Sequence, residues 1–248
     1  PQRIATIPSQ AIRCTTDRIG RIYVQHANFT SRHHFLPLNI PANAPQPMPG
    51  PETGYSVESV SWDGRVIAYR HTLRSDSIVT GPFGVRPVSG WVQLSGDGRI
   101  AWIRRTSDIA RASVVSVDDF HELKEYLTPG RIWSVTGDGQ LALGVNLDNP
   151  PRPVTVLGGD HLAPFPILQH PQATLYRPKT SVDGQWVTFS SVDPHRGMRI
   201  FIAPFRQAQP VPVAEWIEAA EGTSPAFSHS GDRLFFTSNR DGNWCIYE

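Results

Sequence analysis

The sequence predicts an all-β protein, a six-bladed β-propeller whose N-terminal strand completes the last blade. A unit recurs along the chain: a short apolar stretch, a small polar residue, an Asp-Gly type turn and a second apolar stretch. The 248 residues include 23 prolines, which end strands and fix turns and so favour many short strands over helices. All-β proteins of this length often form one domain, so we expect a single domain over residues 1–248.

One glycine marks the turn in each copy of the unit: Gly20, Gly64, Gly98, Gly139, Gly184 and Gly231. Successive glycines lie 34–47 residues apart, and four short strands with their turns need about 40–45 residues, the size of one propeller blade. A clear copy is the pentapeptide Ser-Gly-Asp-Gly-Arg at 95–99, and the copy at 16–21 is degenerate. Asp-Gly supplies the positive φ of a hairpin turn. We therefore expect each Asp to cap its own turn and not to act as a catalytic carboxylate.

The stretches after the turns are nearly continuous runs of strand formers, typical of strands covered on both faces by neighbouring blades. We expect such strands at 66–69, 100–103, 186–189 and 234–237, with further strands at 77–80, 112–115 and 199–202. Residues 117–127 have helical spacing but fall where an outer strand is due, so we predict a strand there. An apolar stretch at 3–8 precedes the first unit, and the sixth unit ends after three strands. A closed ring would pair these two ends, because closure removes exposed sheet edges.

Charge and composition exclude several classes of partner. Lys and Arg number 23 and Asp and Glu 22, so no strong field attracts nucleic acid. No apolar run approaches the ~18 residues of a membrane span. Cys14 and Cys245 lie near opposite ends of the chain. They form a disulfide if the ring brings the ends together, or two buried thiols, and both readings stay open. The chain begins at Pro1 without Met or a signal-peptide pattern, and we expect it to be a piece of a longer protein.

The stretch 224–242, which reads SPAFSHSGDRLFFTSNRDG, resembles a PD40 repeat, the WD40-like repeat of TolB. Residues 186–191 and 198–205 fit the same template. The resemblance implies a bacterial propeller that binds another protein on one face of the ring. It also implies a periplasmic or other extracytoplasmic location, and a scaffold or sensor role within a larger protein.

The loops that join the second and third strands of the blades share one face of such a ring, and loops on rigid scaffolds carry function. The candidate binding residues in these loops are Arg32, His33, Arg74, Asp76, Arg105, Asp108, Asp148, Asp193, His195, Arg196, Arg240 and Asp241. Aromatic residues near the start of the inner strands, Trp91 and Trp133 among them, lie on or near that face. Aromatic side chains beside arginine suit a protein-binding patch, whereas packing between blades is the alternative.

These patterns favour a non-catalytic module that binds a protein or peptide. The sequence contains no G-x-S-x-G elbow and no Walker-type loop, and it indicates no catalytic residue, metal ligand set or cofactor. A ring channel lined by strand-start carbonyls can nevertheless hold Ca²⁺. The alternative function is a lyase or hydrolase with a metal or a His/Asp/Arg site at the channel mouth, to which His26, His71, His170 and His195 could contribute. A sensor domain of a larger receptor or kinase is a third reading.

Overall fold

The computed structural model describes residues 1–6, 11–16, 21–26, 34–37, 46–47, 54–71, 73–105, 108, 110–128, 130–146, 150–193 and 195–248. Between residues 5 and 47 it describes the backbone, together with the buried side chain of Ile22. The one helix in this part of the chain is a 3₁₀ turn, η1 (Val213–Glu215). None of the described segments forms a helix with the length and apolar character needed to cross a membrane.

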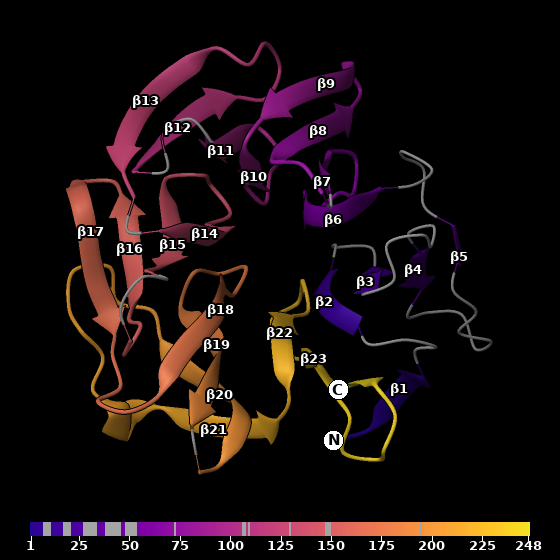
Figure 1. Ribbon diagram of the computed structural model, residues 1–248, viewed down its shortest axis with the longest axis vertical. Coiled ribbons are helices and arrows are strands. Elements are labelled where there is room, and N and C mark those ends of the chain that lie inside the picture. The colour runs from indigo at the N-terminus through magenta and orange to yellow at the C-terminus, as the bar shows by residue number, and fades with distance from the viewer. Residues whose placement is uncertain are drawn as a thin grey trace.

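The chain folds as an all-β propeller, with four-stranded antiparallel sheets arranged radially around a centre (Figure 1). The described strands form six such sheets. The first contains β2 (Ala11–Thr16), β3 (Arg21–His26), β4 (His34–Pro37) and β5 (Gln46–Pro47). The second contains β6 (Tyr55–Val60), β7 (Ile67–His71), β8 (Asp76–Gly81) and β9 (Gly84–Ser89), and the third β10 (Trp91–Leu94), β11 (Ile100–Arg104), β12 (Arg111–Ser116) and β13 (Glu122–Leu127).

The remaining sheets repeat this order. The fourth contains β14 (Arg131–Val135), β15 (Leu141–Val145), β16 (Val154–Gly158) and β17 (His161–Leu168). The fifth contains β18 (Thr174–Thr180), β19 (Trp186–Asp193), β20 (Gly197–Pro204) and β21 (Ile217–Glu221). The last contains β22 (Thr223–Phe227), β23 (Leu234–Ser238), β24 (Cys245–Tyr247) and, on its outer edge, β1 (Arg3–Thr6). The first strand of each sheet lies nearest the centre (Figure 1).

The two chain ends meet in the last sheet. Strand β1 pairs with β24 so that Arg3 lies opposite Tyr247 and Thr6 opposite Cys245. The main chains of Gln2 and Glu248 exchange two hydrogen bonds of 2.9 Å. Residues 3–6 at the start of the sequence therefore lie beside the last strand. Cys245 is a free, buried thiol, and the side chain of Cys14 lies outside the described part of the chain, so both readings of the two cysteines remain predictions.

The hydrophobic core lies between neighbouring sheets. Leu143 and Val156 of the fourth sheet pack in one buried cluster with Phe189 of the fifth. Trp102 of the third sheet packs against Leu157 of the fourth, and its indole Nε1 donates a 2.9 Å hydrogen bond to the carbonyl of Gly139. Each large apolar side chain buried in this way contributes about 1.5–3 kcal/mol. The predicted covering of the strands on both faces is confirmed for these sheets.

The Asp-Gly turns close the hairpins between the first and second strands of the sheets. In the turn after β10, Asp97 Oδ1 accepts a 2.6 Å hydrogen bond from the Ser95 hydroxyl and a 3.0 Å bond from the Arg99 N–H. Asp63, Asp138 and Asp183 make the same pair of contacts in their turns. Gly98 has φ +74°, which glycine adopts without strain. The expectation that each Asp caps its own turn is confirmed at these positions.

This connectivity gives the propeller two distinct ends. The Asp-Gly turns (61–66, 95–100, 136–141, 181–186 and 228–234) lie at one end of the central channel, here called the turn face. The loops between second and third strands, and the links from one sheet to the next, lie at the other end, here called the loop face.

The strand predicted within 117–127 is confirmed as β13 over 122–127, and residues 117–121 form the turn before it.

Candidate functional site

Most of the loop residues that the sequence singles out interact within their own loop or blade. Arg105 forms an ion pair of 3.2 Å with Glu122, and Asp108 forms one of 3.4 Å with Arg111. The main-chain N–H of Arg74 donates to His71 Nδ1, and Oδ1 of Asp76 is buried without a hydrogen-bond partner among the described residues. Arg32, His33 and Asp148 lie outside the described residues.

Asp193 caps the loop that follows β19. Its Oδ1 accepts hydrogen bonds from the main-chain N–H groups of His195 at 2.7 Å and Arg196 at 3.0 Å. These two bonds stabilise the carboxylate and hold the pKa of Asp193 below its ordinary value. His195 is exposed beside it. This part of the predicted binding face is therefore a self-capped loop.

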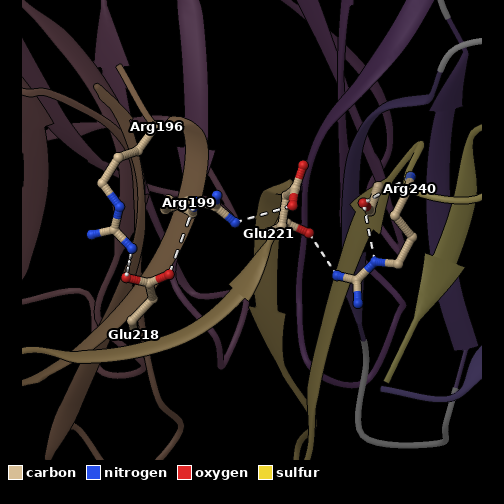
Figure 2. Close-up of polar contacts among 6 residues, drawn as sticks. Arg196, Arg199, Glu218, Glu221 and Arg240 are labelled. Carbon is tan, nitrogen blue, oxygen red and sulfur yellow. Dashed lines mark hydrogen bonds and ion pairs between the residues drawn. The ribbon is translucent and has the colours of Figure 1, made fainter. Parts of the chain in front are cut away.

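Arg196 and Arg240 belong to a chain of polar contacts that joins the fifth sheet to the last one (Figure 2). Arg196 forms a 2.7 Å ion pair with Glu218, and Arg199 pairs with Glu218 and Glu221. The Arg240 guanidinium donates a 2.7 Å hydrogen bond to the carbonyl oxygen of Glu221. Arg240 thus bridges the two neighbouring sheets, whereas Arg196 and Arg199 form their ion pairs within the fifth sheet.

Asp241 next to this network accepts a 2.7 Å hydrogen bond from the hydroxyl of Tyr247. Burial, followed by this bond, raises the pKa of the Tyr247 phenol well above its ordinary value. The Arg240 guanidinium lies 4.7 Å from the centre of the Tyr247 ring. Asp241 and Arg240 therefore both stabilise the last strand.

Trp91 and Trp133, unlike the loop residues, lie together in one cluster of side chains at the loop end of the channel. The guanidinium of Arg131 lies 5.1 Å from the Trp91 ring and 4.1 Å from the Trp133 ring. Arg70 and Arg104 approach the Trp91 ring at 4.6 and 4.8 Å. The Arg177 guanidinium lies 6.0 Å from the Trp133 ring. We call these six residues, Arg70, Trp91, Arg104, Arg131, Trp133 and Arg177, the arginine–tryptophan cluster.

A buried ion pair lies next to the cluster, in the channel. Arg131 Nη2 lies 2.8 Å from Glu58 Oε1, with 13% and 2% of the two side chains exposed. Gln93 donates a 3.1 Å hydrogen bond to the same carboxylate oxygen. Glu58, Gln93 and Arg131 stand on β6, β10 and β14, so this contact ties together the inner strands of three successive sheets.

Below this pair, the channel contains a cavity of about 90 Å³ bounded by inner strands. Its polar lining includes Glu58, Gln93, Ser134, Lys179 and His229. At the turn face Trp62 extends over neighbouring turns. A Cβ atom at Gly96 or at Gly137 would lie 2.1 Å from the Trp62 ring, and His229 meets that ring edge-on at 5.6 Å. The absence of side chains at these two glycines thus makes room for Trp62 to cover this end of the cavity.

Two inner-strand residues beside the cluster adopt left-handed backbone conformations. Arg177 has φ 53° and Ser224 has φ 56°, values that are costly for residues with a Cβ atom. Their side chains contact each other, because Arg177 Nη1 donates to the Ser224 hydroxyl, and also, at 3.0 Å, to the Thr223 hydroxyl. Such strain concentrates at functional sites.

Two of the histidines considered as metal ligands accept hydrogen bonds within their own loops, and the side chain of His26 lies outside the described part of the chain. His71 Nδ1 accepts N–H bonds from Leu73 and Arg74, and His170 Nδ1 accepts them from Gln172 and Ala173. Within the ranges that the structure describes, no three His, Cys, Asp or Glu side chains form a potential metal site.

Sequence reasoning identified the two tryptophans but missed Glu58, Lys179 and the four arginines of the cluster. These residues stand within strands, whereas the predicted site residues stand mainly in loops. The one local signal was the Arg-Ile-Trp triplet at 131–133, directly after a link between sheets. Bulges in the inner strands, for instance between Ile132 and Ser134, decide which side chains face the channel.

Comparison with known proteins shows structural likeness only. No family model and no curated protein matches the sequence. A putative TolB from Agrobacterium tumefaciens matches with a TM-score of 0.68 at 15% identity, over 98% of this chain and 92% of that one. TolB from Acinetobacter baumannii matches with a TM-score of 0.63 at 14% identity, over 93% of this chain and 63% of that one. Hydrazine synthase from Kuenenia stuttgartiensis matches with a TM-score of 0.63 at 11% identity, over 94% and 75%. The chain therefore has a TolB-like β-propeller fold.

Proposed function

We propose that the chain is a single six-bladed propeller domain, closed by its N-terminal strand, that binds a protein or peptide at its loop face without catalysing a reaction. The sheet pairing of β1 with β24 supports the closed ring. The arginine–tryptophan cluster at the loop end of the channel supports the binding role, and this role rests mainly on it. Tryptophan, tyrosine and arginine are the residues enriched at the energetic centres of protein interfaces.

The chemistry of the cluster suits recognition better than proton transfer. A guanidinium stays protonated at working pH and presents several donors in a fixed plane, so it binds but does not act as a general base. Half-buried indole rings add apolar area that a partner side chain can cover. The self-capped loops around the cluster form a polar rim.

A selection experiment tests this function. A displayed random peptide library is selected on the purified domain, and the enriched peptides are titrated against the Trp91→Ala and Arg104→Ala variants. We expect each substitution to weaken binding at least ~10-fold, which corresponds to ~1.4 kcal/mol and is typical of an interface centre. Thermal melting confirms that each variant is folded.

The matched control is Arg99→Ala, an exposed arginine on the turn face. Its peptide affinities should equal those of the unmodified domain. Peptides that lose affinity in Arg99→Ala, but keep it in both cluster variants, would place the binding surface on the opposite face and contradict the proposal.

A further inference from the structure

The cavity behind the arginine–tryptophan cluster is bounded by Glu58 and Trp133 and, towards the turn face, by Trp62 and His229. Trp62 covers its turn end, where its ring fills the space above Gly96 and Gly137. The main-chain N–H of Trp62 donates a 2.6 Å hydrogen bond to the Gly96 carbonyl. A volume of about 90 Å³ accommodates a small group of non-hydrogen atoms, since about 10–15 Å³ of such cavity space suffices for one water. A small molecule or a single side chain therefore fits.

Positive charge dominates the surroundings of this pocket. Lys179 contributes to the lining, and Arg131 and Arg177 stand at its loop end within the cluster. Glu58 is the one carboxylate among the described lining residues, and its Oε1 already accepts hydrogen bonds from Arg131 and Gln93. Charges in a concave site of low dielectric constant focus the potential, so the pocket attracts an anion.

Three buried polar atoms in and beside the pocket have no hydrogen-bond partner among the described residues. Ser134 Oγ and His229 Nδ1 belong to lining residues, and Trp91 Nε1 lies in the cluster. An indole N–H can only donate, and a hydroxyl can donate, so these groups match a ligand rich in acceptor oxygens. Buried polar groups are otherwise almost always paired.

The backbone is distorted where it positions one of the cations. Arg177 and Ser224 both hold left-handed conformations and are bonded to each other through their side chains. This arrangement fixes the Arg177 guanidinium beside the Trp133 ring at the loop end. A preorganised planar guanidinium suits a carboxylate, which it can bind through two parallel hydrogen bonds.

We propose that the channel binds a carboxylate group that is held by Lys179, Arg177 and the Ser134 hydroxyl. The carboxylate belongs either to a small free acid or to an acidic peptide side chain, and both present the same chemistry. The site goes beyond the proposed function, since it requires no macromolecular partner.

Titration calorimetry of the full chain tests the site, with chloride keeping the ionic strength constant. The probes are sodium acetate, sodium malonate and a short Glu-containing peptide, with its Gln counterpart as the neutral control. We expect saturable one-to-one binding of at least one acid and no binding of the Gln peptide. Acetate or malonate binding identifies a free acid as a sufficient ligand, whereas binding of the Glu peptide alone identifies a peptide side chain.

Lys179→Met should weaken this binding at least ~10-fold, and Lys179→Arg should restore part of it, because the charge returns. Arg99→Met removes an exposed charge on the turn face and should leave the affinity unchanged. Absence of saturable binding for all the acids, equal affinity in Lys179→Met, or equal binding of inorganic phosphate would each overturn the carboxylate site.

Discussion

At the scale of single residues, Trp62 and the two glycines beneath it form one packing unit. A methyl group at Gly96 would overlap the Trp62 ring, since its Cβ would lie 2.1 Å from Cε2. We expect Gly96→Ala to lower the free energy of unfolding by about 1–3 kcal/mol, as overpacking does. In a Trp62→Ala background the same substitution should have little effect, because the obstructing ring is gone. Urea denaturation of the four proteins measures this coupling, and additive losses would contradict it.

The buried pair of Glu58 and Arg131 leads to a second residue-scale prediction. Glu58→Ala leaves the Arg131 guanidinium in a poorly solvated channel without its carboxylate, and removing one member of such a pair costs about 3–5 kcal/mol. The double variant Glu58→Ala/Arg131→Ala removes both charges, so we expect it to lose less stability than the sum of the two single variants. Urea denaturation measures the free energy of unfolding of each variant. If the double variant loses as much stability as the two single variants together, the two charges are independent.

At the scale of the element, the repeating turn depends on its small polar residue. Ser95 is fully buried, and its hydroxyl oxygen accepts a 3.0 Å hydrogen bond from the N–H of Ile100 while it donates to Asp97. Ser95→Ala leaves the N–H of Ile100 unsatisfied, which costs about 1–3 kcal/mol. Ser95→Thr keeps the hydroxyl and serves as the control. Denaturant midpoints of the two variants compare the losses, and equal losses would assign the effect to packing instead.

The carboxylates of these turns make the stability of the fold depend on pH. Hydrogen bonds from Ser181 and the Gln185 N–H hold the pKa of Asp183 below its ordinary value, and the hydroxyls of Ser230 and Ser228 do the same for the pKa of Asp232. A lowered pKa in the folded state stabilises the fold above pH ~4, and this contribution is lost as the pH falls through the folded-state pKa. We expect Asp183→Asn/Asp232→Asn to be less stable than the unmodified protein at pH 7, with the difference shrinking towards pH 2.5. A urea series across this pH range measures it, and a constant difference would exclude the linkage.

The elements that the sequence predicts correctly are those specified by neighbouring residues. Gly98 and Asp97 define their turn within five residues, and β13 follows from its position in the repeat. The site depends instead on register. A bulge between Tyr176 and Lys179 shifts which side chains of β18 face the channel, and a slip of one residue reverses the faces of a strand. The sequence likewise does not predict the ion-pair partners of loop arginines. Arg196, for example, pairs with Glu218, which lies on another strand.

At the scale of the whole molecule, neighbouring sheets depend on one another for their cores. Phe189 of the fifth sheet is buried against residues of the fourth, and Trp102 of the third bonds to the turn at Gly139. In the sheets whose side chains are described, no blade buries both of its faces alone, so stability is distributed around the propeller, as in other repeat folds. The arginine–tryptophan cluster has the same property, because its members come from several sheets. A blade that shifts therefore alters the proposed binding surface.

The pairing of β1 with β24 leads to a prediction for the whole propeller. Deleting residues 1–6 removes the outer strand of the last sheet and exposes the main-chain edge of β24. If this strand closes the ring, the deletion should lower the melting temperature by at least ~5 °C, equivalent to about 2 kcal/mol for a domain of this size. It should also promote association through the open edge. Calorimetry and light scattering measure both effects, with Arg3→Ala as the control because it keeps the main-chain pairing. A truncated chain that melts and sediments like the full-length protein would show that β1 does not close the ring, since a closing strand contributes hydrogen bonds that no other segment replaces.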